Sequence, residues 1–395
     1  MGNSQRKNNL ITVKIVKGTV QDNFGKKYTV DFVGDDDDFV NISYYSEEKK
    51  NSSSIKVLLS QNQNEIYDIC FINNYSYLLV GCNKGYLYVY RRKNNGKANL
   101  IFNDLICKFR PNNDDIIQLI KLQSGHLLIL CRDSSAKVLK IEIDINGILY
   151  EDKKKCQVIQ TLLEEGEPSE NSGIELNSGN LIISQGYFIN FFEKKENSES
   201  ISNSDIVFLL TKKIFTNSDN INIIKIDSKT IVASQISNIS LDFYDINNHS
   251  LIKRVDRIEF GNNKNIMCLI NKDTLAVGGN NGIIYLIDTL RKQLFNISHI
   301  DNCGIITCIK PIEINNIIIA SFDSNNKSND LIVCKIKENN NFEEIKRKNK
   351  VHDDKIIDIK LITMNISKNW NNFVNNYNVI TIGKEHKIKL VLNDA

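Results

Sequence analysis

A repeated strand–turn–strand pattern constrains the fold of this chain more than any other feature of its sequence. Each unit has a short apolar strand, a tight polar turn and a strand in which apolar and polar residues alternate. The starts of the seven units are roughly 43 to 61 residues apart, a period typical of propellers and other repeat architectures. The units span 77–90, 126–141, 180–195, 230–245, 274–288, 317–336 and 378–392.

Further short β-branched runs complete most of these periods. They precede the units at 66–71, 116–122, 221–226, 266–270, 305–309 and 356–361, and weaker strands follow at 206–210, 251–255 and 342–345. Amphipathic stretches of helical period are almost absent, which excludes a fold of alternating helices and strands. Four strands in each period is the layout of a propeller blade. The sequence therefore predicts an all-β, seven-bladed β-propeller of four-stranded blades.

Some residues at the unit boundaries resemble those of the WD40 family, which ends its third strand with Trp-Asp and places a His ahead of its first strand. Tyr244-Asp245 and Ile287-Asp288 stand at the first of these positions, and His352 stands at the second. The resemblance covers roughly residues 55–395. No unit has the complete Trp–Ser–His–Asp set of that family, so other propeller families remain open. The resemblance implies a rigid disc that binds proteins or peptides.

The last unit ends after its third strand, and an N-terminal segment is expected to supply the fourth. Ile55–Leu59 lies at the right distance before the first inner strand to pair there and to close the ring, which removes two exposed sheet edges. Residues 51–395 are thus assigned to the propeller. Residues 1–50 form an extension with a polar linker and a hairpin of Leu10–Val16 with Tyr28–Val33.

Charge, hydropathy and cysteine usage restrict the partners and the location. A formal net charge of +3 lacks the basic excess of a nucleic-acid-binding domain, so no nucleic acid is expected. No apolar h-region follows Met1 and no apolar run of about 18 residues occurs, so neither secretion nor a transmembrane segment is expected. Nine irregularly spaced cysteines favour a reducing compartment. We expect the cytoplasm, with the nucleus as the alternative.

Three local patterns suggest ligands or modifications but favour simpler interpretations. The start at Gly2 resembles an N-myristoylation signal, although Arg6 stands where Ser or Thr is preferred. Acylation there would give weak membrane association. Asp35–Asp38 does not continue into a calcium-binding loop. Cys303 and Cys308, with His299 nearby, lack a fourth zinc ligand. The favoured interpretations are a disordered start at Gly2, a solvated turn at Asp35–Asp38, and ordinary strand and loop residues at Cys303 and Cys308.

No catalytic constellation and no cofactor-binding fingerprint occurs in the sequence. The leading hypothesis is therefore a non-catalytic protein-interaction scaffold or adaptor within a multiprotein complex, with no cofactor, catalytic residue or metal. One alternative is a propeller hydrolase or lyase, which would need acidic or His residues without charge partners at the channel mouth. Another is a membrane-trafficking adaptor, which would gain support if Gly2 were acylated.

The candidate interaction surface comprises turn residues, a loop and one aromatic anchor. The turns between second and third strands hold polar side chains, and the loop before the last inner strand holds His352 and Asp353. Trp370 lies in a polar insertion, where it is as well suited to anchoring a partner as to packing on a blade. The turn residues are Asn83, Lys84, Arg132, Asp133, Gln185, Asn280, Asn281, Asp323, Lys384 and Glu385.

Overall fold

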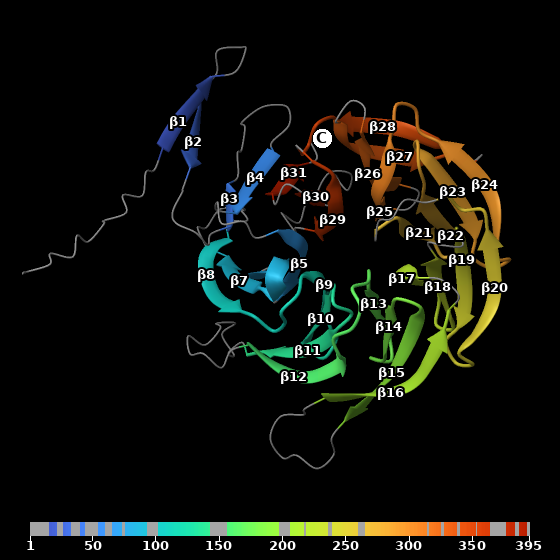
Figure 1. Ribbon diagram of the computed structural model, residues 1–395. Coiled ribbons are helices and arrows are strands. Elements are labelled where there is room, and N and C mark those ends of the chain that lie inside the picture. The colour runs from blue at the N-terminus through green and yellow to red at the C-terminus, as the bar shows by residue number, and fades with distance from the viewer. Residues whose placement is uncertain are drawn as a thin grey trace, which may run out of the picture.

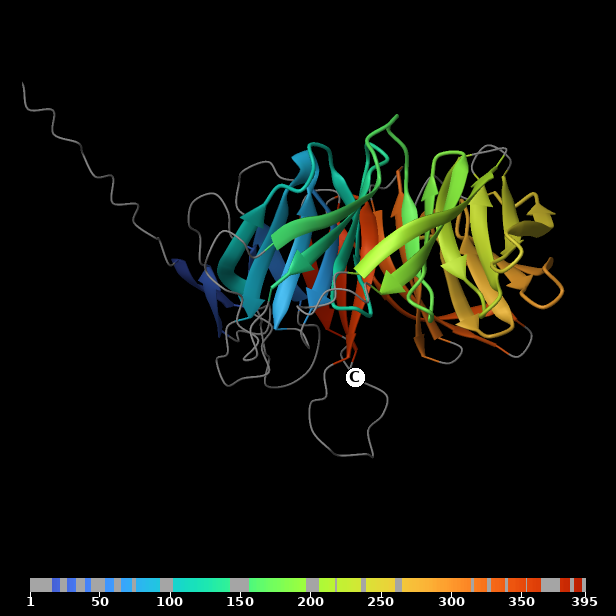
Figure 2. The same cartoon turned by 90° about the horizontal axis from the view of Figure 1, so that it is seen from below.

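Almost all strands of the structure belong to sheets that surround one common axis (Figure 1). Viewed from the side, the ring is a disc with loops on both faces (Figure 2). The structure is a computed structural model. It describes residues 16–21, 27–32, 40–43, 54–59, 65–72, 76–92, 102–142, 156–196, 206–216, 219–235, 239–259, 265–313, 316–324, 328–337, 340–352, 354–363, 377–383 and 387–392.

Six sheets are four-stranded blades in which consecutive strands pair. In each blade the first strand lies nearest the axis and the last lies on the rim (Figure 1). The first three blades are β5 (Ile66–Ile72), β6 (Tyr77–Cys82), β7 (Leu87–Arg92) and β8 (Phe102–Phe109); β9 (Ile116–Lys121), β10 (Leu127–Cys131), β11 (Ala136–Ile141) and β12 (Cys156–Leu163); and β13 (Ser172–Glu175), β14 (Leu181–Gln185), β15 (Phe188–Glu196) and β16 (Ile206–Phe215). The next three are β17 (Asn220–Lys225), β18 (Thr230–Gln235), β19 (Ser240–Asp245) and β20 (Ser250–Asp256); β21 (Met267–Asn271), β22 (Thr274–Gly278), β23 (Ile283–Asp288) and β24 (Gln293–His299); and β25 (Ile305–Glu313), β26 (Asn316–Asp323), β27 (Ser328–Ile336) and β28 (Phe342–Lys348).

The remaining sheet of the ring combines segments from both ends of the chain, and we call it the closing sheet. Its strand order is β29 (Ile356–Thr363), β30 (Tyr377–Gly383), β31 (Lys387–Leu392), β4 (Ser54–Leu59) and β3 (Val40–Ser43). β31 pairs with β4 in antiparallel register, with Ile388 opposite Val57. The N-terminal strand expected at Ile55–Leu59 therefore does pair with the last unit.

The prediction of seven four-stranded blades is wrong. The structure has six four-stranded blades, and the closing sheet has five strands. The additional strand is β3, which pairs outside β4 with Ile42 opposite Val57. This strand lies in the segment 1–50 that was expected to carry only a hairpin and a polar linker. Four residues are too few to give a clear alternating pattern, which is why the sequence did not reveal it.

An N-terminal hairpin exists, but its first strand differs from the expected one. β1 (Val16–Gln21) pairs antiparallel with β2 (Lys27–Phe32) in a sheet of their own. The second strand matches the prediction at Tyr28–Val33 to within one residue. The first strand lies at the end of the predicted Leu10–Val16 segment and continues beyond it. Residues 10–15 are outside the described residues.

The core of the ring lies between neighbouring sheets. Among the described residues, six clusters of buried apolar side chains each join two adjacent sheets, from the β5–β8 blade around to the closing sheet. All six residues of β6 are buried. At the rim, by contrast, all seven residues of β28 and all but one of β20 are exposed or half-buried. A single sheet cannot bury both of its faces, so the stacked ring is what stabilises each sheet.

Tight turns between second and third strands use residues in the left-handed region. In the β6–β7 connection, a 3₁₀ turn (Asn83–Gly85), Lys84 has φ 55° and Gly85 has φ 75°. Asn281 and Gly282 repeat this geometry between β22 and β23, with φ 54° and 72°. A Cβ on Gly85 would lie 2.0 Å from the Asn112 carbonyl oxygen, so glycine is required there.

Candidate functional site

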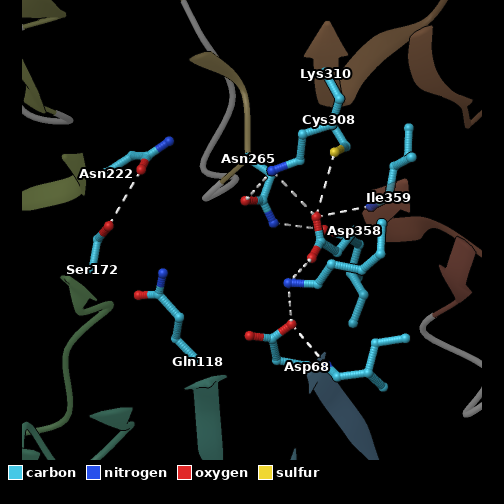
Figure 3. A network of polar contacts seen from close by, with 12 residues as sticks. Asp68, Gln118, Ser172, Asn222, Asn265, Cys308, Lys310, Asp358 and Ile359 are labelled. Atoms are coloured by element: carbon cyan, nitrogen blue, oxygen red, sulfur yellow. Dashed lines mark hydrogen bonds and ion pairs between the residues drawn. The ribbon is translucent and has the colours of Figure 1, made fainter. Parts of the chain in front are cut away.

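A recurring bulge places one residue of most inner strands on the ring axis. In β5, β9, β17, β25 and β29 the pairing with the second strand skips one residue. The residues directly after the skipped positions are Asp68, Gln118, Asn222, Cys308 and Asp358. Their side chains converge from different sheets (Figure 3). The bulge therefore turns an otherwise apolar strand so that it presents a mostly polar side chain at the axis.

Alternating carboxylates and ammonium groups form one half of this axial network. Lys360 Nζ lies 2.7 Å from Asp68 Oδ1 and 2.9 Å from Asp358 Oδ2. Lys310 Nζ lies 3.6 Å from Asp358 Oδ1 and donates to Asn265 Oδ1 at 3.2 Å. The chain of contacts thus runs from β5 through β29 to β25 and to Asn265, two residues before β21. Two carboxylates and two ammonium groups neutralise each other.

Backbone amides also donate hydrogen bonds to both carboxylates. Asp68 Oδ2 accepts a hydrogen bond from Leu119 N of the neighbouring blade at 2.7 Å, and Oδ1 accepts one from Ile69 N at 2.8 Å. Asp358 Oδ1 accepts from Ile359 N at 2.8 Å. Asp68 thereby connects its own blade to the closing sheet on one side and to the β9–β12 blade on the other.

Burial and neighbouring charges shift the pKa values of these groups in different directions. Burial raises the pKa of the Asp68 carboxyl; the Lys360 ammonium opposes this rise and the Asp358 carboxylate adds to it. Burial acts in the same direction on Asp358, but the ammonium groups of Lys360 and Lys310 outweigh it and hold its pKa below the ordinary value. Burial alone would lower the pKa of Lys360, yet the two carboxylates raise it.

Uncharged side chains form the other half of the network. Gln118 Oε1 accepts from Gly173 N at 2.9 Å. Ser172 Oγ donates to Asn222 Oδ1 at 3.2 Å and accepts from Ile223 N at the same distance. These bonds link three successive blades, β9–β12, β13–β16 and β17–β20. Figure 3 shows the contact between Ser172 and Asn222. The axial residues consequently hold neighbouring sheets together with satisfied polar groups.

A second polar cluster lies at the end of the axis where the turns between second and third strands meet. The Arg132 guanidinium lies 4.8 Å from the centroid of the Tyr67 ring and 2.8 Å from Asp115 Oδ2. Asp115 Oδ1 also accepts from Lys84 N at 3.0 Å, and Lys84 O accepts from Arg110 Nε at 2.9 Å. The Arg132 side chain remains 38% exposed. It is thus both fixed in orientation and accessible to a partner.

Of the turn residues expected from the sequence, Gln185 and Asp323 are the last residues of the second strands β14 and β26. The turns that follow second strands hold Asn83, Lys84, Arg132, Asp133, Asn280 and Asn281. Lys84 and Asn281 are exposed, whereas the side chain of Asp133 is buried. The half-buried turn residues are Asn83, Arg132, Gln185, Asn280 and Asp323. Of the other candidates, Asp353, Trp370, Lys384 and Glu385 lie outside the described residues.

His352 lies inside the ring rather than on its surface. Its side chain is 1% exposed, and its Nε2 lies 2.8 Å from Thr381 Oγ1 of β30. In the second blade, Asn112 occupies a similar buried position, donating to Asp133 Oδ2 at 2.7 Å and accepting from Lys137 Nζ at 2.8 Å. Different polar groups therefore stand where the WD40 family has its hydrogen-bonded set.

The two Asp residues at the ends of third strands cap the turns that follow. Asp245 Oδ1 accepts from Asn247 N and Asn248 N, both at 2.8 Å. Asp288 Oδ1 accepts from Leu290 N at 2.9 Å and from Arg291 N at 2.8 Å. A carboxylate at this position therefore has a local structural role that does not depend on a preceding tryptophan.

Sequence reasoning missed the axial residues. Inner strands were expected at the short β-branched runs that precede the units, but a polar residue interrupts several of them at the third position, as in Ile66–Ile72 (IYDICFI). That interruption was the available signal for Asp68 and Asp358. The bulges that turn these residues toward the axis depend on pairing with the second strand, which a single sequence does not show.

The part of the chain that the structure describes shows neither a metal site nor a membrane span. No group of three or more His, Cys, Asp and Glu side chains there is placed to hold a metal ion. None of its helices is long and apolar enough to cross a membrane.

Solved structures of other proteins superpose on this fold over most of the chain. The Saccharomyces cerevisiae protein Sqt1 superposes with a TM-score of 0.60 at 13% identity, covering 87% of this chain and 90% of Sqt1. U3-55K superposes with a TM-score of 0.57 at 10% identity, covering 84% of this chain and 97% of U3-55K. Both are WD40 proteins, so this chain is a β-propeller similar in fold to theirs. No protein-family model and no curated protein matches the sequence.

Proposed function

We propose that this protein is a non-catalytic interaction scaffold of the WD40 type, and that the face around Arg132 binds a partner protein. The observation that carries the proposal is the fixed but accessible Arg132 guanidinium between Tyr67 and Asp115. Arginine held by an aromatic ring and a carboxylate is prepared for recognition, since little side-chain entropy is lost on binding. Arginine is also enriched at energetic hot spots of interfaces.

The ionisable groups on the axis favour a scaffold over an enzyme. A hydrolase or lyase would need acidic groups without charge partners at the channel. The two carboxylates that converge there, Asp68 and Asp358, each lie within 3 Å of the Lys360 ammonium. The oxygens of these carboxylates are already occupied by the ammonium group and by backbone amides, which leaves them poorly placed to contact a substrate. The similarity to two WD40 structures supports the same choice at the level of the fold.

Quantitative affinity purification tests the proposed scaffold function. Tagged wild-type protein, Arg132→Glu and the control Arg291→Glu would each be expressed in the native cells and purified under gentle conditions. Arg291 is a matched control because it is an exposed arginine on the turn between β23 and β24, away from the proposed surface. We expect partners to be recovered with the wild type and with Arg291→Glu, and to fall about tenfold with Arg132→Glu. Recovery of the wild-type protein alone would contradict the proposal.

We also propose a cytoplasmic location. All nine cysteines are free thiols, which supports a reducing compartment. A fluorescent fusion at the C-terminus, viewed in the native cells, checks this. Signal confined to the nucleus or to a membrane-bound organelle would contradict it.

A further inference from the structure

Exposed aromatic side chains cluster on the β13–β16 blade. Tyr187 is 47% exposed and Phe215 is 65% exposed, and their rings stack with centroids 6.3 Å apart. Phe188 meets Phe215 edge-on at 5.6 Å. We call these three residues the aromatic patch. Adjacent aromatic rings left in water are uncommon on a soluble surface and are typical of protein-binding sites.

The aromatic patch is held in place by β15, by β16 and by the turn that precedes β15. Phe188 of β15 lies directly opposite Phe215 of β16 in the antiparallel pairing. The next residue, Thr216, donates from both its backbone N and its Oγ1 to Tyr187 O, each at 2.7 Å. Lys213 Nζ lies 3.8 Å from the centroid of the Phe188 ring. A partner that covers the aromatic patch would therefore order few new groups.

A loop rich in glutamate lies on the same face, between β12 and β13. Residues 164–170 contain Glu164, Glu165, Glu167 and Glu170, and all four side chains are exposed. We call this segment the acidic loop. Backbone contacts to the preceding turn fix it: Gly166 N donates to Asp133 O at 2.7 Å, and Ser169 N donates to Arg132 O at 2.9 Å. Its carboxylates are thus presented from a defined position.

Two contacts place the acidic loop beside the aromatic patch. Ser134 Oγ donates to Glu167 O in the loop at 2.5 Å, while Ser134 O accepts from Gln185 Nε2 at 3.2 Å. Gln185 is two residues before Tyr187. A Cβ placed on Gly186 would lie 3.9 Å from the Ser169 Cβ, so the turn that carries Tyr187 packs against the loop.

We infer that the aromatic patch and the acidic loop together bind a basic segment of a partner protein, one with apolar side chains between its Lys or Arg residues. This inference rests on the proposed scaffold function. The apolar side chains would cover Tyr187 and Phe215, and the basic ones would face the four carboxylates. The Lys213 ammonium lies over the Phe188 ring of the aromatic patch. An acidic segment would meet repulsion from the loop, so charge complementarity selects a basic occupant.

Panning a phage-displayed library of random dodecapeptides on the full-length protein tests the inference. Three variants are compared with the wild type: Tyr187→Ala with Phe215→Ala; Glu164→Lys with Glu165→Lys and Glu167→Lys; and the control Leu290→Ala. Leu290 is 71% exposed on the turn between β23 and β24, so it matches the apolar exposure without belonging to the surface. Circular dichroism and thermal unfolding of each variant establish that it is folded, which is expected because all substituted side chains are exposed.

We expect the wild type to enrich peptides that combine Lys or Arg with Leu, Phe or Trp. The affinity of these peptides should fall about tenfold for the first two variants and stay unchanged for Leu290→Ala. Higher salt should also weaken binding, because exposed charges are screened. Enrichment of acidic peptides, equal retention by both surface variants, or no enrichment at all would overturn the inference. If partners still purify with the wild-type protein from cells, such a failure leaves the scaffold function standing. If the wild-type protein purifies without any partner, the scaffold function is refuted as well.

Discussion

Asp68 Oδ1 lies 2.7 Å from Lys360 Nζ, and this ion pair joins the β5–β8 blade to the closing sheet. It lies at the point where the two chain ends complete the ring. Asp68 also accepts a backbone hydrogen bond from Leu119 in the following blade. One carboxylate thus connects three successive sheets, so its contribution to stability should exceed that of a surface ion pair.

Replacing one partner of this pair should destabilise the fold strongly. Lys360→Met leaves two buried carboxylates without their shared ammonium, and we expect a loss of about 3 kcal/mol in the free energy of unfolding. The double variant Asp68→Asn with Lys360→Met should recover part of that loss. Lys335→Met, which replaces an exposed lysine on β27, is the control and should change stability by less than about 0.5 kcal/mol. Urea unfolding measures all three, and equal effects of both lysine variants would contradict the prediction.

The two axial carboxylates should contribute opposite pH dependences. The pKa of Asp358 lies below its ordinary value of 3.8 in the folded state because two lysines outweigh its burial. Its stabilisation is present above pH 3.8 and is lost as the pH falls through the folded pKa, so Asp358→Asn should flatten the acid limb. Burial raises the pKa of Asp68 in the folded state. Its contribution to stability is therefore fully present below pH 3.8 and is lost as the pH rises through the folded pKa.

Asp68→Asn should therefore have the opposite effect on the pH profile of stability. Because the wild-type carboxyl gains stability on acidification in the range just above pH 3.8, its removal should steepen the loss of stability there. Urea midpoints measured between about pH 3 and pH 7 for both variants provide the comparison. Parallel profiles of the two variants would show that the carboxylates do not differ in this way.

The repeating units and the closure of the ring could be predicted from the sequence because both depend on local patterns. Apolar runs such as Tyr77–Cys82 mark a second strand without any knowledge of its neighbours. Ile55–Leu59 was recognisable as a strand lacking a partner in its own unit. The tight turn at Asn83–Gly85 was equally visible, since Gly follows a polar residue that tolerates a positive φ.

The fifth strand of the closing sheet and the surface sites could not be predicted in this way. Val40–Ser43 becomes a strand only because β4 offers it an edge. Asp68 and Lys360 lie near opposite ends of the chain, and their contact depends on ring closure. Tyr187 and Phe215 meet only through the pairing of β15 with β16. Contacts between distant segments are not encoded in the local pattern of either one.

Alanine at Gly85 should destabilise the fold more than alanine at Gly125. Both glycines have positive φ, 75° and 85°, so either substitution adds backbone strain of about 1 kcal/mol. A Cβ on Gly85 would also lie 2.0 Å from the Asn112 carbonyl oxygen, whereas nothing lies within 4 Å of one on Gly125. We expect Gly85→Ala to cost at least about 2 kcal/mol. Urea unfolding of both variants decides the matter, and equal losses would argue against the close contact.

Thiol reactivity should be low in the folded protein. Burial raises the pKa of the Cys70 thiol to about 11 and that of Cys131 to about 12, from an ordinary value of 9.0. The thiolate is the reactive form, so at pH 8 Cys70 should react about a hundredfold more slowly than an unperturbed thiol. Titration with a chromogenic disulfide should detect few fast thiols in the folded state. It should detect all nine in urea, and rapid reaction of most thiols before unfolding would contradict this.

Two truncations should separate the closing strand from the rest of the N-terminal segment. Removal of residues 1–50 deletes β3 but leaves β4, whose pairing with β31 closes the ring. Removal of residues 1–62 deletes β4 as well and exposes the edge of β31. An unpaired edge strand is a template for association with other chains. We therefore expect the shorter truncation to keep a cooperative thermal transition and to show no aggregation by light scattering, whereas the longer one aggregates or loses the transition. Identical behaviour of the two proteins would show that β4 does not stabilise the ring.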